Sequence, residues 1–393
     1  MQQDPIVLVS GARTAMGGLQ GALSSLTAPE LGGIAIADAI QRAGLQPTDV
    51  QEVIMGCVLP AGVKQGPARQ AMMNAGIPVA TGATTVNKLC GSGMKAVMLA
   101  HDLIKAGTND IMVAGGMESM SNAPHLLTKA RSGYRLGHGE VKDHMFMDGL
   151  EDARTGKLMG VFAQEIADDR GYSRESLDNF AISSLKRAMT AIEQGKLKAE
   201  TAAVTVKTRK GEVTIEDDEQ PHQANIDKIP SLRPAFKKDG TITAANSSSI
   251  SDGASALVLM RESEAQKRGL KPMARIAAHA TNSREPSEFT LAPIGSIEKV
   301  LEKAGWSLDE VDLFEINEAF AVVTLLAMDG LGIPHEKTNI YGGACAQGHP
   351  IGSTGSRILV TLMHALQQEG KKKGIASLCI GGGEATAVAI ELI

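Results

Sequence analysis

Several short segments carry side chains that could do chemistry, and the first holds a cysteine at the start of a predicted helix. Apolar residues at helical spacing follow Cys90 and predict a helix that ends near Gly107. Free N–H groups and the dipole at a helix N-terminus favour thiolate, so Cys90 is a candidate nucleophile. Gly91 and Gly93 are poor helix formers, which indicates close approach of a backbone or a ligand. Alternatively, Cys90 is a buried cysteine in the core.

The second half of the chain supplies possible partners for that thiol. His349 lies between Gly348 and Pro350 in a glycine-dense segment. An imidazole held opposite a thiol is what an activated nucleophile requires, although an isolated loop histidine is more often structural. Asn317 and Glu318 follow a predicted strand, where they either face a cleft or cap the next helix.

A second cysteine, Cys379, ends a predicted buried strand and precedes the three glycines of 381–383. Backbone N–H groups in such a run are suited to holding an oxyanion. They could instead hold a phosphate, but the segment lacks the Lys-Ser/Thr of a P-loop and the spacing of a dinucleotide-binding fingerprint.

Composition bounds the class of protein. The 393 residues predict two or three domains, and 43% hydrophobic with only 3% aromatic residues predicts an aliphatic core. A net charge of −5 argues against a nucleic-acid binder. The four cysteines are widely separated, so we expect neither a cysteine zinc site, nor any other metal site, nor a disulfide framework, but a reducing compartment. With no signal-peptide pattern and no apolar run of membrane-spanning length, we expect a cytoplasmic protein that does not insert into membranes.

Strands and helices alternate up to about Met120, which predicts an α/β unit with a mostly parallel sheet. In this unit we expect strands at 6–9 and 110–114, each ending at the glycine that follows. The range 121–247 is more polar and predicts an excursion domain of loops and helices, with one amphipathic helix over 173–194. Its acidic run at 216–219 is typical of a solvated face.

The first pattern then returns. Residues 36–45 match 297–306 at a constant offset of 261, and 111–118 are echoed by 377–384. The repeat predicts two duplicated α/β halves with a site between them. It places Gly56 opposite Asn317 and the Cys90 segment opposite 348–357. The predicted units are 1–120 with 248–270, then 121–247, then 271–393.

Four motifs in this order resemble the thiolase family, in its acetoacetyl-CoA type, over essentially the whole chain. They are NKLCGSG at 87–93, NEAF at 317–320, GHPIG at 348–352 and CIGGG at 379–383. The resemblance implies a five-layered α-β-α-β-α fold of two similar halves, with the inserted loop domain covering the coenzyme A site.

The resemblance also implies residue roles. Cys90 would accept the acyl group as a thioester, and His349 would take the thiol proton and then help to hold the thioester oxygen. Cys379 would exchange a proton with the acetyl-CoA methyl group. Asn317 would anchor a water beside His349 in a first oxyanion hole, and the N–H groups of Cys90 and Gly381 would form a second. The implied reaction is the reversible, ping-pong Claisen condensation of two acetyl-CoA to acetoacetyl-CoA and CoA, with no cofactor beyond these substrates.

Positions that match the family's binding residues are Ser248 at the pantetheine arm, Phe236 in the segment that starts at Leu232, and Met159 and Phe289 at the acyl pocket. By residue type alone, Met159 and Phe236 are equally well read as core.

The chain departs from the family pattern in several places. His222 stands where an arginine often meets the nucleotide end of CoA, Tyr341 where asparagine is usual, and Leu158 where histidine is frequent. Phe289 replaces a frequent methionine. Glu384 follows the triglycine in place of Met or Gln, and a charge there would raise the pKa of the Cys379 thiol.

These departures leave acyl-chain preference open. The alternatives are a 3-ketoacyl-CoA thiolase for longer or 2-methyl-branched chains, a decarboxylating synthase or hydroxymethylglutaryl-CoA synthase on the same fold, and a non-catalytic acyl-CoA-binding protein. The synthases lack the second thiol, which argues against them. Thiolases of this type are usually homotetramers, with 121–147 as the candidate tetramerisation loop.

Overall fold

The two halves of the chain form two similar parts of one mixed sheet. The computed structural model describes residues 4–393. The strand order is β4-β3-β5-β11-β1 in the first half and β12-β15-β14-β13 in the second, and the parts meet where β1 pairs with β12. The strands are β1 Ile6–Thr14, β3 Glu52–Gly56, β4 Gly82–Val86, β5 Ile111–Ser119, β11 Ser251–Arg261, β12 Ala274–Ser283, β13 Leu313–Ile316, β14 Lys373–Ile380 and β15 Glu384–Leu392. Two short strands, β2 Gly17–Gly18 and β8 Thr201–Ala202, pair with β11 and β1.

Each half has the same strand directions, which confirms the predicted duplication. β3 is parallel to β4 and β5, and β13 is parallel to β14. β11 and β15 each run antiparallel to both neighbours. The prediction of a mostly parallel sheet is therefore wrong, because the last two strands of each half return by antiparallel pairing.

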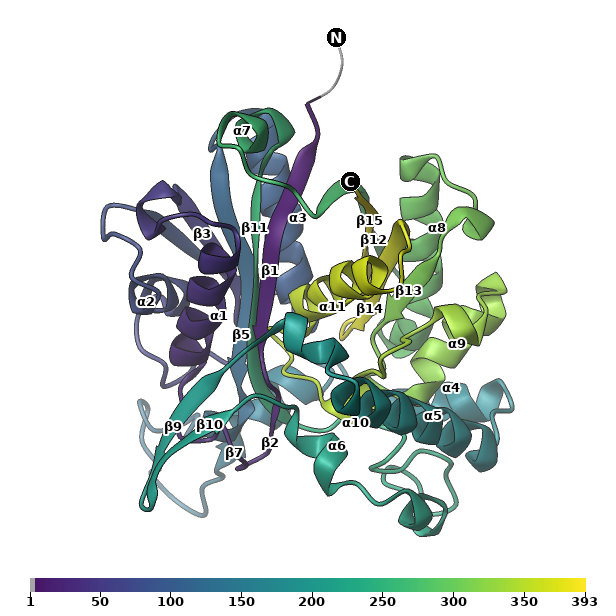
Figure 1. Ribbon diagram of the computed structural model, residues 1–393. Coiled ribbons are helices and arrows are strands. Elements are labelled where there is room, and N and C mark those ends of the chain that lie inside the picture. The colour runs from purple at the N-terminus through teal and green to yellow at the C-terminus, as the bar shows by residue number, and fades with distance from the viewer. Residues whose placement is uncertain (1–3) are drawn as a thin grey trace.

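Helices complete five layers (Figure 1). α1 Ala28–Arg42 and α2 Pro67–Asn74 cover the outer face of the first part of the sheet, and α8 Ala292–Ala304 and α9 Ala321–Leu331 cover that of the second. α3 Ser92–Ala106 and α11 Thr354–Gln368 pack against each other between the two parts.

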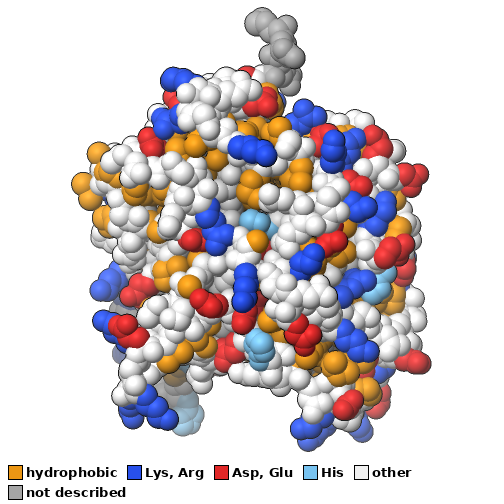
Figure 2. All heavy atoms as spheres, in the orientation of Figure 1, with side chains coloured by type: hydrophobic (Ala, Val, Ile, Leu, Met, Phe, Trp, Pro, Cys, Tyr) orange, Lys and Arg blue, Asp and Glu red, His pale blue; other side chains and the backbone are white. Residues whose placement is uncertain are grey.

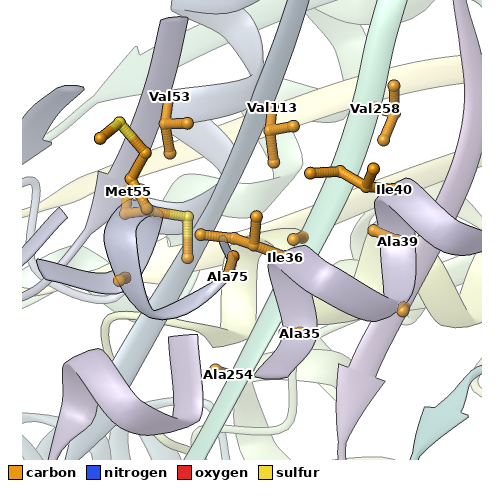
Figure 3. Packing of buried hydrophobic residues seen from close by; sticks show 14 of the residues in the cluster. Ala35, Ile36, Ala39, Ile40, Val53, Met55, Ala75, Val113, Ala254 and Val258 are labelled. Atoms are coloured by element: carbon orange, nitrogen blue, oxygen red, sulfur yellow. The ribbon is translucent and has the colours of Figure 1, made fainter. Parts of the chain in front are cut away.

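Aliphatic side chains hold the outer layers to the sheet, as the low aromatic content predicts. In Figure 3, Ile36 and Ile40 of α1 lie against Val113 of β5 and Val258 of β11. Burying such side chains contributes about 1.5–3 kcal/mol each. α1 begins directly after Thr27, where Thr27 and Glu30 form a capping box.

The structure corrects one part of the predicted repeat. α1 and α8 are each followed by a glycine with positive φ, Gly44 (+70°) and Gly305 (+68°), so the offset of 261 is confirmed. Strand pairing then aligns Gly115 with Ser377 and Met117 with Cys379, because Met55 pairs with Gly115 and its counterpart Ile316 pairs with Ser377. The echo between 111–118 and 377–384 is therefore out of register by four residues.

Two strands run past their predicted ends. β1 continues to Thr14, and β5 continues through Gly115 and Gly116 to Ser119. Glycine here does not end the strand but allows close packing: a Cβ on Gly115 would overlap the Ser255 carbonyl oxygen.

Between β5 and β11 the chain leaves the sheet. This range contains α4 Met159–Asp169, α5 Arg174–Glu193, α6 Glu219–Gln223, and two ribbons formed by β6 His125–Leu126 with β7 Lys142–Asp143 and by β9 Val204–Thr208 with β10 Gly211–Ile215. α5 starts after Ser173 as predicted, whereas the ribbons were not expected. The remaining helices are α7 Glu262–Lys267, α10 Ala344–Gln347, a π-helix at Phe146–Leu150, and 3₁₀ turns at Pro47–Asp49, Met120–Asn122, Lys196–Ala199, Ile226–Ser231, Pro286–Leu291, Leu308–Glu310 and His335–Lys337.

The acidic run is not simply a solvated face. Asp218 is buried and its two carboxylate oxygens accept from Arg13 at 2.6 and 3.0 Å. Glu219 accepts from the N–H groups of Gly18 and Ala22, both at 2.9 Å. These acids fasten the excursion to the end of β1.

The surface carries both signs of charge. Figure 2 shows acidic and basic side chains interspersed over the face that it draws. Within residues 4–393, no helix combines the length and the apolar character that crossing a bilayer would need.

Candidate active site

A cavity of about 530 Å³ opens where the two halves and the excursion meet. Four of its wall residues are predicted catalytic residues, and they come from segments far apart in the chain. The predicted residues that line it are Cys90, His349, Cys379, Gly381, Ser248, Met159, Phe236 and Phe289. The arrangement has the content of an active site: two thiols and an imidazole on an otherwise largely apolar wall.

A strained turn between β4 and α3 positions Cys90. Leu89, directly before it, adopts a φ of +48°, which is rare for a residue with a branched side chain. The Asn87 side-chain oxygen accepts from the Leu89 N–H at 2.9 Å, and the Ser92 hydroxyl donates to the Leu89 carbonyl at 2.7 Å. The turn therefore places Cys90 on the cavity wall, not in the core.

The glycines beside Cys90 allow the close approach that the sequence predicts. A Cβ on Gly93 would lie 2.9 Å from the backbone nitrogen of Ser356, so α3 and α11 touch backbone to backbone here. A Cβ on Gly91 would overlap the side chain of Ile380, the residue that follows Cys379. Close packing of the two halves thus brings the two cysteine segments together.

The predicted thiolate at Cys90 is wrong for the resting site. Burial raises the pKa of Cys90 to about 11, although the N–H groups of Gly381 and of Cys90 itself act in the opposite direction. Desolvation therefore raises the pKa of Cys90 by more than the helix N-terminus lowers it, and Cys90 is a thiol at neutral pH. The same two N–H groups lie where the resemblance places the second oxyanion hole.

Hydrogen bonds hold His349 in one tautomer. Its Nδ1 lies 2.6 Å from the hydroxyl oxygen of Thr354, and that hydroxyl donates its single proton to the Pro350 carbonyl at 3.0 Å. Nδ1 must then carry the proton and donate to Thr354, which leaves Nε2 as the acceptor.

Nε2 of His349 is buried and has no partner among the described residues. Burial, followed by the charge of Arg357, lowers the pKa of His349 to about 3, so the imidazole is neutral. The backbone is held as well: Gly348 has a φ of +111°, and the His349 N–H donates to the Ser249 carbonyl at 3.2 Å. A neutral imidazole with a free Nε2 on the cavity wall is suited to accept the thiol proton.

Asn317 directly follows β13 and does not itself line the cavity, although Ala319 and Phe320 of the same segment do. It is 2% exposed, and both polar atoms of its side-chain amide are buried without a partner among the described residues. Its N–H donates to the Ser377 carbonyl at 2.9 Å, which fixes the backbone. Buried amides are seldom left unpaired, so this one is suited to hold a water or a ligand atom.

Capping, the alternative for Asn317 and Glu318, is wrong. The residue before α9 is Phe320, and no side chain caps that helix. Glu318 instead accepts from Asn339 at 2.8 Å, Ser184 at 2.7 Å and the Cys345 N–H at 3.1 Å, so it ties the loop before His349 to β13 and α5.

Cys379 lies near the end of β14 and is 1% exposed. Burial, followed by the charge of the Cys90 sulfur, raises the pKa of Cys379 well above its ordinary value. The turn after it needs glycine, since Gly382 and Gly383 adopt φ values of +84° and +89°. A Cβ on Gly383 would also overlap the Arg284 carbonyl oxygen. The turn leaves the Gly381 N–H facing Cys90.

Glu384 does not act on Cys379 as expected. Its carboxylate pairs with Lys88 at 2.5 Å and accepts from Ser283 at 3.3 Å. The ion pair links the turn that carries Cys90 to the residue that follows the triglycine. Tyr341, another departure, donates to Glu369 at 2.7 Å, away from the cavity.

Aromatic rings line the end of the cavity predicted to hold the acyl group. Phe236 and Phe289 each meet Phe320 edge to face, with centroids 6.0 and 6.3 Å apart. Phe320, Phe146 and Leu158 also line the cavity but were not predicted as site residues. Phe320 belongs to the NEAF motif, and that motif could have identified it as a site residue.

Polar binding residues are divided between the cavity and the surface. Ser248 lines the cavity, and its hydroxyl donates to the Ala319 carbonyl at 3.0 Å. Leu232 and His222 do not line it: Leu232 follows a 3₁₀ turn and its carbonyl accepts from Arg174, and His222 is exposed on α6. A site for these two could only lie outside the cavity mouth.

Glu118 is a buried acid near the site that the sequence did not single out. It accepts from the N–H groups of Val58 and Leu59 at 2.9 and 3.1 Å. Burial raises the pKa of Glu118 to about 7. The sequence signal was hidden because β5 was expected to end before Glu118.

Comparison with known proteins agrees with this geometry. The model of the N-terminal domain of thiolases matches residues 6–263, and the model of the C-terminal domain matches residues 270–392. An acetyl-CoA acetyltransferase of Escherichia coli is 48% identical, covering 98% of both chains. One from Chromobacterium violaceum is 47% identical, covering 98% of this chain and 99% of that protein.

A solved structure extends the comparison to the fold. The crystal structure of the Bacillus anthracis acetyl-CoA acetyltransferase is 39% identical and superposes with a TM-score of 0.97, covering 99% of each chain. The predicted five-layered thiolase fold is confirmed. From the domain matches, the sequence identity and the superposition together, the chain belongs to the thiolase family.

Proposed function

We propose that this chain is an acetyl-CoA C-acetyltransferase, which reversibly condenses two molecules of acetyl-CoA to acetoacetyl-CoA and free CoA. The observation that carries the proposal is the gathering of Cys90, His349 and Cys379 on one cavity. The names of the similar proteins from Escherichia coli and Chromobacterium violaceum support the same substrates.

In the first half-reaction, the Cys90 sulfur attacks the thioester carbonyl of acetyl-CoA. Nε2 of His349 takes the thiol proton as the S–C bond forms. The CoA sulfur then leaves and receives the proton of Cys379, so the first half-reaction yields acetyl-Cys90, CoA-SH, a Cys379 thiolate and a His349 that carries a proton on Nε2. Because the resting Cys90 is a thiol and His349 is neutral, proton transfer accompanies the attack and does not precede it.

In the second half-reaction, Cys379 as thiolate removes a proton from the methyl group of a second acetyl-CoA. The resulting carbanion attacks acetyl-Cys90, a carbon–carbon bond forms, and the Cys90 sulfur leaves and is protonated. The enolate oxygen faces Nε2–H of His349 and a water on Asn317, and the oxygen on the acetyl-Cys90 carbon faces the N–H groups of Cys90 and Gly381. The unpartnered Asn317 amide supports this assignment.

A short acyl group is part of the proposal. Three phenylalanine rings from different segments line the cavity, and Phe236 and Phe289 each meet Phe320 edge to face, so bulky side chains occupy the part of the wall assigned to the acyl group. We assign the range 121–247 to covering the coenzyme A, since Met159 and Phe236 contribute to the wall. Ser248 contacts the pantetheine arm, and Leu232 and His222 lie on the path to the nucleotide end.

The purified protein should consume acetoacetyl-CoA when free CoA is added, and the rate should fall as the acyl chain is lengthened or 2-methyl-branched. Faster turnover of longer or branched 3-ketoacyl-CoA would make the protein a broader 3-ketoacyl-CoA thiolase. CoA binding without turnover and without acylation of Cys90 would make it a non-catalytic binding protein and contradict the proposal.

We also propose a cytoplasmic homotetramer, active in fatty acid metabolism. All four cysteines are free, which fits a reducing compartment. Leu127, Leu136 and Val141 of the segment 121–147 are 53%, 98% and 61% exposed, which suits a contact between subunits. Light scattering during size-exclusion chromatography should give the mass of four chains, and a monomer mass would contradict the assembly.

A further inference from the structure

Two imidazoles and a carboxylate meet at a place where the halves join, apart from the cavity. His101 and Asp102 lie on α3 of the first half, and His279 lies on β12 of the second. Oδ1 of Asp102 is 2.9 Å from Nδ1 of His101 and 2.9 Å from Nε2 of His279. One donor atom from each of the three lies within 4.8 Å of the others.

We propose that His101, Asp102 and His279 bind one divalent transition-metal ion of the zinc class. Two imidazole nitrogens and one carboxylate oxygen are a ligand set that such ions prefer. A tetrahedral ion with bonds of about 2.0–2.1 Å holds its ligands about 3.3 Å apart. The two contacts of Asp102 need to open by only a few tenths of an ångström, and the two imidazole nitrogens lie within 4.8 Å of each other. A water can take the fourth position because the Asp102 side chain is 52% exposed.

The surroundings hold the two imidazoles in place and leave the carboxylate accessible. The side chains of His101 and His279 are 11% and 18% exposed, against 52% for Asp102. The two nearby cations are Lys105, which acts against a bound ion, and Lys303, whose ammonium donates to the His279 carbonyl at 3.1 Å.

The ion would fasten the two halves to each other and take no part in the thiolase chemistry. None of the three residues lines the cavity that holds Cys90. The sequence predicts no metal site because the ligands are far apart: Asp102 and His279 are separated by 177 residues. The competing interpretation is a carboxylate that merely accepts hydrogen bonds from two imidazoles.

Titration of the chelator-treated, full-length protein with Co²⁺ distinguishes these interpretations. We expect one equivalent to bind, with visible d–d absorption and no thiolate-to-cobalt charge transfer, and Zn²⁺ to displace it. Asp102→Asn and His279→Gln, on different elements, should each abolish the absorption. His138→Gln, which removes an exposed loop imidazole, should keep it.

Two readouts guard against misfolding and against binding elsewhere. Acetoacetyl-CoA thiolysis should be unchanged in all three variants, and Zn²⁺ should raise Tm only in the wild type and His138→Gln. No Co²⁺ absorption in the wild type, absorption retained in both cluster variants, or charge transfer that places the ion on the cysteines would each overturn the proposal.

Discussion

Each half has a turn before its central helix, and both turns reach the cavity, but only one of them places a thiol there. α3 and α11 each have 15 residues, and the residue two positions before the helix is Cys90 in one half and Gly352 in the other. Cys90 faces Cys379 and Gly381 across the cavity. The carbonyl oxygen of Gly352 instead lies so close to Gly116 that a Cβ there would overlap it.

The strand ends differ in the same way. Asn317 follows β13, whereas its counterpart Gly56 ends β3, where a Cβ would lie 2.6 Å from the Cβ of Ser92. Cys379 corresponds to Met117, which is fully buried in the core. The duplicated fold therefore forms an active site in one place and a closely packed contact in the equivalent place. The first has Cys90, Asn317 and Cys379, and the second has glycine or methionine at the equivalent positions.

The largest effect is expected at the active site. Cys90→Ser should lower acetoacetyl-CoA thiolysis by at least about 10⁴-fold, because a serine hydroxyl without a strong base is a poor nucleophile. Steady-state assays check this, with an unchanged Tm as the control for folding. Activity within tenfold of the wild type would remove Cys90 from the chemistry.

A substitution in the closely packed contact between Gly116 and Gly352 should lower the free energy of unfolding. Gly116→Ala should destabilise the protein by about 3 kcal/mol, because the methyl group would press on a backbone carbonyl that cannot move aside. Gly82→Ala is the matched control: its methyl group would meet only the Glu52 side chain at 3.9 Å. It should cost less than about 1 kcal/mol. Equal urea-unfolding free energies for the two variants would show that this contact is not tightly packed.

The protonation of Cys90 can be read from its reactivity. Since burial raises the pKa of Cys90 to about 11, the thiolate fraction increases as pH rises. The rate of Cys90 alkylation by iodoacetamide should therefore climb about tenfold per pH unit between roughly pH 7 and 9. A rate that is flat above pH 7 would mean that the helix N-terminus lowers the pKa of Cys90 by more than desolvation raises it.

The smallest effect concerns the Lys88–Glu384 pair, which links the Cys90 turn to the residue after the triglycine. Lys88→Gln and Glu384→Gln should each lower kcat a few-fold, with a coupling energy of at most about 1 kcal/mol, because the pair is partly exposed and screened. A double-mutant cycle on kcat measures it. Strictly additive effects would show that the pair does not position the turn.

Helix ends, the repeat of the two halves and the motifs of the site could be predicted from local sequence patterns. The amphipathic helix predicted over 173–194 is confirmed, since α5 spans Arg174–Glu193. The offset of 261 correctly places Gly56 opposite Asn317, because helix ends and short turns repeat with the fold. Four motifs together indicated the family.

Other features depend on distant contacts and could not be read locally. The register of β14 is set by its pairing with β13, so the sequence match between 111–118 and 377–384 is displaced by four residues from the structural alignment. The buried pairing of Asp218 with Arg13 joins positions 205 residues apart. The thiol form of Cys90 reflects desolvation by both halves, whereas the sequence shows only the helix behind it.

Mass-spectrometric mapping of the protein after mixing with acetyl-CoA shows directly which cysteine is the nucleophile. We expect one acetyl group on Cys90 in the wild type, retained in Cys379→Ala, whose condensation rate should fall by about 10²–10⁴-fold. An acetyl group on Cys379 with Cys90 free would reverse the two roles. The absence of any acetylated cysteine would contradict the account.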